Sequence, residues 1–204
     1  MEDGARLIRV LVFDADGVVI DPPHRFMAYL QQELKVPPER SRRFFQGIFL
    51  ECLVGQADLK EAIAPFLAEW GWSGSVEQLL QRWFEEEHCI NDELVNFIQG
   101  LRKRGYACAV ATNQERYRLG YMRDAMRLAT LFDAVFGSAE LGEMKPNAGF
   151  YRAVTERLGV SPEEILFWDD GEANVQGARA FGWWAERYTG FEGFVRKVRI
   201  YLRY

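Results

Sequence analysis

The sequence contains few cysteines and no long apolar run. Its three cysteines, Cys52, Cys89 and Cys108, show no CxxC or Cys/His spacing. This pattern argues against a disulfide framework and a zinc site, and it favours a reducing compartment. No run of about 18 apolar residues occurs, and acidic residues precede any signal-peptide core. We therefore expect a cytoplasmic protein that does not span a membrane.

An excess of positive charge is also absent. The chain carries 25 Lys and Arg against 30 Asp and Glu, a formal net charge of −5, which gives no overall attraction to nucleic acid or an anionic membrane. Apolar surface is plentiful, because 49% of the 204 residues are hydrophobic and 14% are aromatic. That length and composition predict one compact domain, or one domain with a modest insertion. No nucleic-acid or membrane partner is expected, and monomer and homodimer both stay open.

Short apolar runs rich in β-branched and aromatic residues predict five strands. These are residues 7–13, 106–111, 134–136, 165–168 and 183–188. Helical spacing of apolar residues occurs at 91–104, 115–128, 149–158 and 173–181. Strands that alternate with helices indicate right-handed crossovers and a parallel sheet covered on both faces. The predicted fold class is α/β, a Rossmann-like doubly wound parallel sheet.

A helical block interrupts this alternation after the first strand. From His24 to Glu87 apolar residues recur every three to four positions, and Pro65 is expected to kink or split its helix. The block is longer than a usual connection, so we expect it to form a structure of its own. The prediction is an α/β core of residues 1–17 and 91–204 with a small helical cap of residues 18–90.

Polar residues follow four of the apolar runs. They are Asp14 and Asp16, Thr112 and Asn113, Lys145, and Asp169 and Asp170. Taken singly, they could be an Asp-Gly turn, a helix cap, a surface lysine and a solvated strand end. The carboxyl ends of parallel strands meet at one edge of a sheet, where ligands bind. Together, therefore, these residues indicate one site.

Four motifs then resemble the haloacid dehalogenase superfamily, and within it the phosphatases with a small helical cap after the first strand. They are VLVFDADGVV, VATNQ, MKPNAGFY and LFWDDGEANVQGARAFG, and the resemblance extends over most of the chain. It implies that Asp14 is a nucleophile that forms an aspartyl-phosphate. It also implies a Mg²⁺ ion held by Asp14, Asp169 and the backbone carbonyl of Asp16. Asp170 would either contact the ion or orient Lys145.

The resemblance assigns the remaining groups to proton transfer and charge neutralisation, which phosphoryl transfer requires. Asp16 is expected to keep a proton for the leaving alkoxide and then to activate water, while the metal holds Asp14 ionised. The dehalogenases have Tyr at this position, so Asp16 favours phosphate chemistry. The phosphate oxygens would be held by Lys145, the Thr112 hydroxyl and the N–H groups of Ala15, Asp16 and Asn113.

The predicted function is that of a Mg²⁺-dependent phosphatase of a small phosphorylated metabolite. A phosphomutase of the β-phosphoglucomutase kind and a catalytically silent binding or regulatory module are the alternatives. Ala15 and Gly171 depart from the family pattern, since a bulkier apolar residue and a small hydroxyl residue are usual there. The candidates for substrate choice in the cap are His24, Arg25, Arg43, Phe44 and Gln46, although Phe44 and the arginines also suit a core position and a solvated helix face.

Overall fold

A five-stranded parallel sheet forms the centre of the protein. The computed structural model describes residues 7–202. The strand order is β3-β2-β1-β4-β5, and every neighbouring pair is parallel. The strands are Val10–Phe13 (β1), Ala107–Thr112 (β2), Ala134–Gly137 (β3), Ile165–Asp169 (β4) and Trp184–Arg187 (β5). The predicted α/β fold is confirmed, with β1 in the middle of the sheet.

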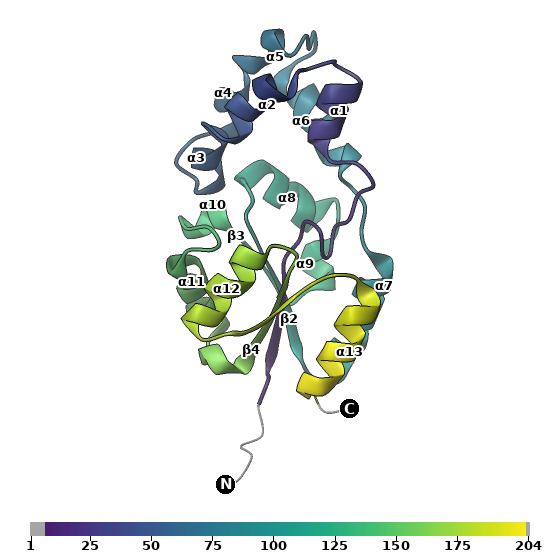
Figure 1. Ribbon diagram of the computed structural model, residues 1–204, viewed down its shortest axis with the longest axis vertical. Helices are drawn as coiled ribbons and strands as arrows, with labels where there is room; N and C mark the ends of the chain where they lie inside the picture. Colours follow the sequence, from purple (N-terminus) through teal and green to yellow (C-terminus); the bar gives the residue numbers. More distant parts are fainter. Residues whose placement is uncertain (1–6, 203–204) are drawn as a thin grey trace.

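Helices cover both faces of this sheet (Figure 1). Side chains alternate along β1, so that Leu11 and Phe13 join the apolar cluster of α7, α8, α9 and α13, whereas Val10 and Val12 join that of α11 and α12. The helices of this part are Asp92–Lys103 (α7), Arg116–Asp124 (α8), Leu128–Leu131 (α9), Ser138–Leu141 (α10), Ala148–Leu158 (α11), Pro162–Glu164 (η1, a 3₁₀ turn), Glu172–Phe181 (α12) and Phe191–Leu202 (α13). None of the helices within residues 7–202 has the length and apolar character needed to cross a membrane.

Six short helices form a separate body above the sheet (Figure 1). They are Phe26–Gln32 (α1), Pro38–Phe45 (α2), Phe49–Leu53 (α3), Leu59–Ile63 (α4), Phe66–Glu69 (α5) and Val76–Glu86 (α6). Pro65 separates α4 from α5, as its missing N–H predicts. The six helices surround their own apolar cluster. This separate core supports our proposal of a cap at residues 18–90, although residues 1–6 and 203–204 of the proposed core lie outside the described chain.

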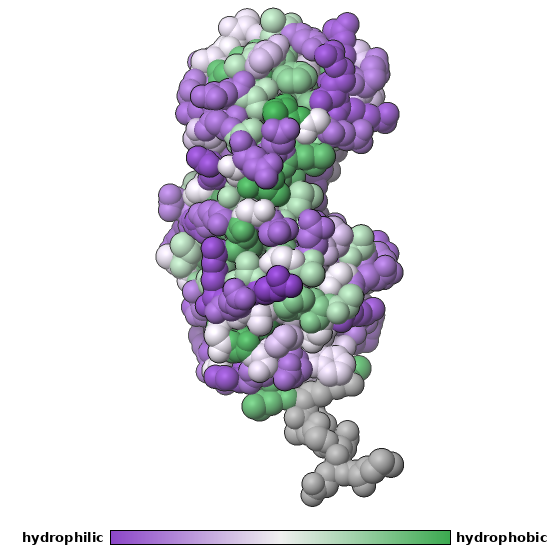
Figure 2. All heavy atoms as spheres, turned by 90° about the vertical axis from the view of Figure 1, so that its left-hand side faces the viewer, coloured by the Kyte–Doolittle hydropathy of each residue, from purple (hydrophilic) through white to green (hydrophobic). Residues whose placement is uncertain are grey.

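Two chain segments, residues 18–21 and 89–91, join the cap to the sheet; we call them the strap. The amide of Asp21 donates a hydrogen bond to the carbonyl of Cys89, and the amide of Asn91 donates one to Val19, both at 2.9 Å. Ile20 and Ile90 form an antiparallel bridge between them. In the space-filling view the outline narrows between the cap and the sheet, and hydrophobic residues gather there (Figure 2).

One predicted helix differs from the structure. The pattern at 115–128 predicts a single helix, but the chain forms α8 up to Asp124 and begins α9 at Leu128. Arg127 adopts the left-handed conformation, with φ of 60°, which a continuous right-handed helix cannot include. Glu115 also lies outside the helix, because its carboxylate caps α8 by accepting hydrogen bonds from the amides of Tyr117 and Arg118.

Candidate active site

The loop after β1 places Asp14 beside the end of β4. The Asp14 amide donates a hydrogen bond to the carbonyl of Trp168 at 2.8 Å, which extends the pairing of β1 with β4 by one residue. Gly17 then turns the chain with φ of 84°, and a Cβ atom at this position would collide with the Asp170 carboxylate. Glycine is therefore required here by both conformation and space. The turn brings the acidic residues from the two strand ends together.

Lys145 is the centre of this cluster. Its Nζ atom lies 2.8 Å from Asp14 Oδ1 and 2.6 Å from Asp169 Oδ2, and it donates to the carbonyl of Ala111 at 3.1 Å. The side chain is only 1% exposed. Burial alone would lower the pKa of Lys145, but the two carboxylates raise it. Lys145 is therefore a buried ammonium and not the surface charge that its isolated position in the sequence also allowed.

Asp169 and Asp170 have different surroundings. Asp169 is fully buried and accepts hydrogen bonds from Lys145, from the Gly171 amide at 2.8 Å and from Asn174 Nδ2 at 3.0 Å. The Asp170 side chain is exposed, and its carboxylate accepts no hydrogen bond from another of the described residues. Of the two, it is therefore Asp169 that holds Lys145 in place. Of the two roles left open for Asp170, orientation of Lys145 is not the one that this arrangement shows.

The carboxylates of Asp14, Asp169 and Asp170 converge. One oxygen atom from each lies within 4.8 Å of the others. Burial raises the pKa of Asp14 and the neighbouring Asp169 raises it further, against the opposing charge of Lys145. Asp170 is exposed but partly shielded by its neighbours, and this partial burial together with Asp169 also raises its pKa. A group of oxygen ligands whose negative charge is incompletely balanced suits a hard divalent cation.

Asp16 is paired with arginine, contrary to the expectation that it keeps a proton. Its two carboxylate oxygens accept hydrogen bonds from the guanidinium of Arg118 at 2.7 and 2.8 Å, and Arg25 lies 3.3 Å away. Gln114 donates a further hydrogen bond to it. Burial alone would raise the pKa of Asp16, but Arg118, together with Arg25 and Gln114, holds it below its ordinary value. The part of the expected division that keeps a proton on Asp16 therefore does not fit this arrangement.

The groups expected to hold phosphate are only partly available. The Ala15 amide, expected to face phosphate, donates instead to Asp14 Oδ1 at 2.7 Å. The amides of Asp16 and Asn113 donate no hydrogen bond within residues 7–202, and neither does the buried hydroxyl of Thr112. The Asn113 side chain joins two loops, because it accepts from the Lys145 amide at 2.8 Å and donates to the Lys145 carbonyl at 3.0 Å.

Three residues at this site were not found from the sequence: Arg118, Gln114 and Glu87. Arg118 is 5% exposed, and besides Asp16 it contacts Glu87 of the cap at 3.0 Å. Glu87 in turn accepts hydrogen bonds from the Phe26 amide and Trp83 Nε1 at 2.8 and 3.1 Å. The sequence held one signal for two of them. Gln114 follows the Thr-Asn motif directly, and Arg118 lies four positions later, a spacing that places two residues on the same face of a helix. Nothing in the sequence indicates Glu87.

The cap candidates are divided between the site and other places. Arg25 lines the site through its contact with Asp16, whereas Arg43 pairs with Glu69 at 3.1 Å and Phe44 is fully buried in the cap core. His24 and Gln46 are both exposed, and neither lines the site cavity described next.

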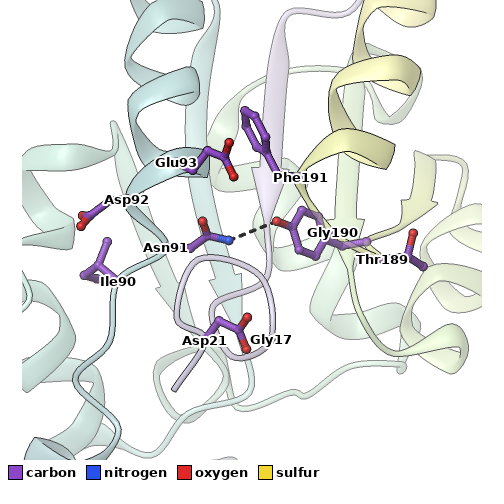
Figure 3. A pocket seen from close by; sticks show the side chains of 10 residues that line it. Gly17, Asp21, Ile90, Asn91, Asp92, Glu93, Thr189, Gly190 and Phe191 are labelled. Atoms are coloured by element: carbon purple, nitrogen blue, oxygen red, sulfur yellow. Dashed lines mark hydrogen bonds between the residues drawn. The ribbon is translucent and has the colours of Figure 1, made fainter. Parts of the chain in front are cut away.

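Two cavities lie near the loop after β1. One of about 320 Å³ is bounded by Asp16 and Asn113 on the core side and by apolar cap residues on the other. A second, of about 660 Å³, lies behind Gly17 between the start of α7 and the segment before α13, where Asn91 donates to the Tyr188 hydroxyl at 3.1 Å (Figure 3). None of the clustered carboxylates lines this second cavity. None of them lines the first cavity either, but Asp16, Asn113 and Arg118 do, so the first cavity is the one that adjoins the candidate site.

Fold and site together define a parallel-sheet enzyme whose acidic residues and buried lysine meet at the strand ends. A model of the haloacid dehalogenase-like hydrolase family matches residues 8–182. The chain belongs to this family, which confirms the family and the hydrolase class indicated by its motifs.

Similar proteins include a phosphoglycolate phosphatase of Pseudomonas putida, 27% identical over 188 residues, which cover 86% of this chain and 67% of that protein. A D-ribitol-5-phosphate phosphatase of Bacteroides thetaiotaomicron is 25% identical over 185 residues, 86% of this chain and 89% of the relative. Among solved structures, a HAD-like family hydrolase from Porphyromonas gingivalis is 25% identical with a TM-score of 0.78, and the match covers 95% of this chain and 98% of that one. A HAD family enzyme from Bacteroides thetaiotaomicron in complex with magnesium and inorganic phosphate is 23% identical with a TM-score of 0.74, over 91% and 96% of the two chains. The last of these likenesses concerns the fold alone.

Proposed function

We propose that the protein is a Mg²⁺-dependent phosphatase of a small phosphorylated metabolite, and that it acts through an aspartyl-phosphate. The observation that carries this proposal is the buried Lys145 held between Asp14 and Asp169, with Asp170 beside them. A fixed positive charge next to a converging set of carboxylates matches the needs of phosphoryl transfer. The names of the curated relatives, phosphatases of phosphoglycolate and of D-ribitol 5-phosphate, support the same reaction type.

Asp14 is the nucleophile in this proposal. Its Oδ1 atom is engaged by Lys145 and by the Ala15 amide, so we assign the attack on phosphorus to Oδ2. A bond forms between this oxygen and phosphorus while the bond from phosphorus to the ester oxygen breaks, and the leaving alkoxide becomes the alcohol by taking a proton from water. A water oxygen then attacks phosphorus, the Asp14 carboxylate is regenerated and inorganic phosphate is released.

The residues at the strand ends fit a magnesium ion. Asp14, Asp169 and Asp170 each offer an oxygen within 4.8 Å of the others, and the Asp16 carbonyl accepts no hydrogen bond within the described chain. We propose these four residues as the binding set. Asp170 has the freest carboxylate of the three, because Asp169 already accepts hydrogen bonds from Lys145, Gly171 and Asn174. The bound ion would reduce the repulsion between the nucleophile and the phosphate.

Asp16 in this arrangement suits the second step better than the first. Held ionised by Arg118, it can accept a proton from the water that hydrolyses the aspartyl-phosphate. Asp16 could itself supply the proton of the leaving alkoxide only after it separates from Arg118 and takes up a proton. We further propose that the phosphate oxygens are held by Lys145, by the Thr112 hydroxyl and by the amides of Asp16 and Asn113.

The test is phosphate release from p-nitrophenyl phosphate with Mg²⁺. Asp14→Asn is expected to abolish turnover, and EDTA is expected to do the same to the unchanged enzyme. Asp21→Asn is the matched control, because Asp21 is exposed and lies outside the carboxylate cluster. A melting temperature near that of the parent shows that each variant is folded. Unchanged turnover in Asp14→Asn or in EDTA would contradict the proposal. With a sugar phosphate as the substrate, isomerised sugar phosphate without free phosphate would favour a mutase.

A further inference from the structure

The 320 Å³ cavity begins at Asp16 and extends into the cap. Asp16 and Asn113 form its core end, beside the groups proposed to hold phosphate. A molecule whose phosphate lies at Asp14 would therefore place its remaining part here. If the proposed phosphatase function holds, the lining of this cavity determines which leaving group the enzyme accepts.

The cap side of the cavity is an apolar wall. It is made by Phe26, Met27, Phe45, Phe49, Leu53 and Trp83. The rings support one another, since the centroid of Trp83 lies 4.8 Å from that of Phe26, 5.5 Å from that of Phe45 and 5.6 Å from that of Phe49. Such mutual packing fixes the side chains before any ligand arrives. The wall therefore presents a preformed surface for an apolar group.

The polar side chains in the lining are already paired with one another. Arg118 binds Asp16 and Glu87, Gln114 donates to Asp16, and Arg25 lies 3.3 Å from Asp16. Two guanidinium groups thus face two carboxylates, and no formal charge remains to attract a second ionic group. A sugar hydroxyl or a carboxylate entering this cavity would lose its water and would have to compete with these existing pairs for a partner.

We propose that the substrate is a phosphate monoester of an uncharged, apolar alcohol about the size of one aromatic ring with a short linker. The volume agrees, because a protein cavity of about 150 Å³ with an apolar lining already accepts benzene, and this cavity is about twice as large at 320 Å³. Polyol phosphates and phosphates that carry a carboxylate are then poor substrates.

The experiment compares kcat/KM for phosphate release from 2-phenylethyl phosphate, ethyl phosphate, glycerol 3-phosphate and phosphoglycolate with Mg²⁺. Their leaving groups are all unactivated, so large differences report on binding of the leaving group. Burial of the ring is expected to favour 2-phenylethyl phosphate over ethyl phosphate by about 10- to 100-fold, and it should exceed the two polar esters as well. Equal values, or preference for a polar ester, would overturn the proposal.

Hydrolysis of acetyl phosphate tests the proposed phosphatase function separately from the proposed substrate class. Its leaving group is small and activated, so its hydrolysis does not depend on contact with the apolar wall. No hydrolysis of any compound would refute the phosphatase itself. Hydrolysis of acetyl phosphate without preference for the phenyl ester would refute only the substrate class.

Phe49→Ala is expected to reduce the ratio between the phenyl and ethyl esters about tenfold while acetyl phosphate is still hydrolysed. Phe49→Leu, which removes less volume, should give a smaller reduction and serves if the alanine variant melts early. Leu50→Ala is the control on the same helix, since Leu50 is 43% exposed and does not line the cavity. A folded Phe49 variant with an unchanged ratio would overturn the assignment.

Discussion

Replacement of Arg118 by Met tests the paired state of Asp16. The parent guanidinium makes two hydrogen bonds to Asp16 and one ion pair to Glu87, and the side chain is only 6% exposed. Loss of one partner from a buried ion pair costs about 3–5 kcal/mol. Arg25 still faces Asp16, and Glu87 keeps its hydrogen bonds from Phe26 and Trp83, so we expect the lower end of this range, about 3 kcal/mol.

The pH dependence of that loss identifies its origin. The pKa of Asp16 is lowered in the folded parent, so the stabilisation from Asp16 is present above its unfolded pKa of about 3.9 and is lost as the pH falls through the folded pKa. In Arg118→Met burial is less opposed and the pKa of Asp16 should rise. The difference in unfolding free energy between parent and variant should therefore be largest near pH 7 and shrink towards pH 4.

Urea denaturation in EDTA at a series of pH values measures this difference. Arg123→Met is the matched control, because the contact of Arg123 with Glu140 is more exposed, with side chains 29% and 44% exposed, and its loss should cost about 1 kcal/mol or less. A pH-independent loss of the same size for Arg118→Met would show that packing rather than charge is responsible. A loss below that of the control would refute the buried pairing.

Three further predictions concern other parts of the molecule. Asp133→Asn should lower the unfolding free energy by about 1–2 kcal/mol at pH 7. Burial alone would raise the pKa of Asp133, but Arg102 holds it below its ordinary value. Urea denaturation should therefore show that the difference in unfolding free energy between parent and variant disappears as the pH falls below about 4. Gly17→Ala should reduce Mg²⁺-dependent phosphate release at least about tenfold, since a Cβ atom would strike Asp170; normal turnover would contradict the close approach. Lys145→Met should abolish turnover and lower the unfolding free energy by about 3–5 kcal/mol, because Asp14 and Asp169 lose the cation that lies between them. A stable and active variant would refute the role of Lys145 as the cation of this cluster.

Local patterns in the sequence predicted the sheet and the place of the site. The five strands are short apolar runs, and each begins or ends within a few residues of its predicted bounds. The polar residues that follow them meet because parallel strands end at one edge, which is a property of the fold class. Asp14, Lys145 and Asp169 could therefore be placed together before any coordinates were known.

The protonation of Asp16 could not be predicted in the same way. Its pairing partner Arg118 is 102 positions away, and Glu87, which completes the pairing, belongs to the cap. No periodicity or motif links these residues. Similarly, only the packing of the strand ends shows that Lys145 bonds to Asp169 and not to Asp170. Which charged residues pair across distant loops depends on the tertiary structure. Where a strand ends can be predicted from the local sequence pattern.

The strap has a consequence for how the enzyme would open. The two segments of the strap are hydrogen-bonded to each other. We therefore expect them to bend together and to resist rotation of the cap about the long axis of the strap. Any opening of the cap would then be a hinge motion in which residues 18–21 and 89–91 move as one unit.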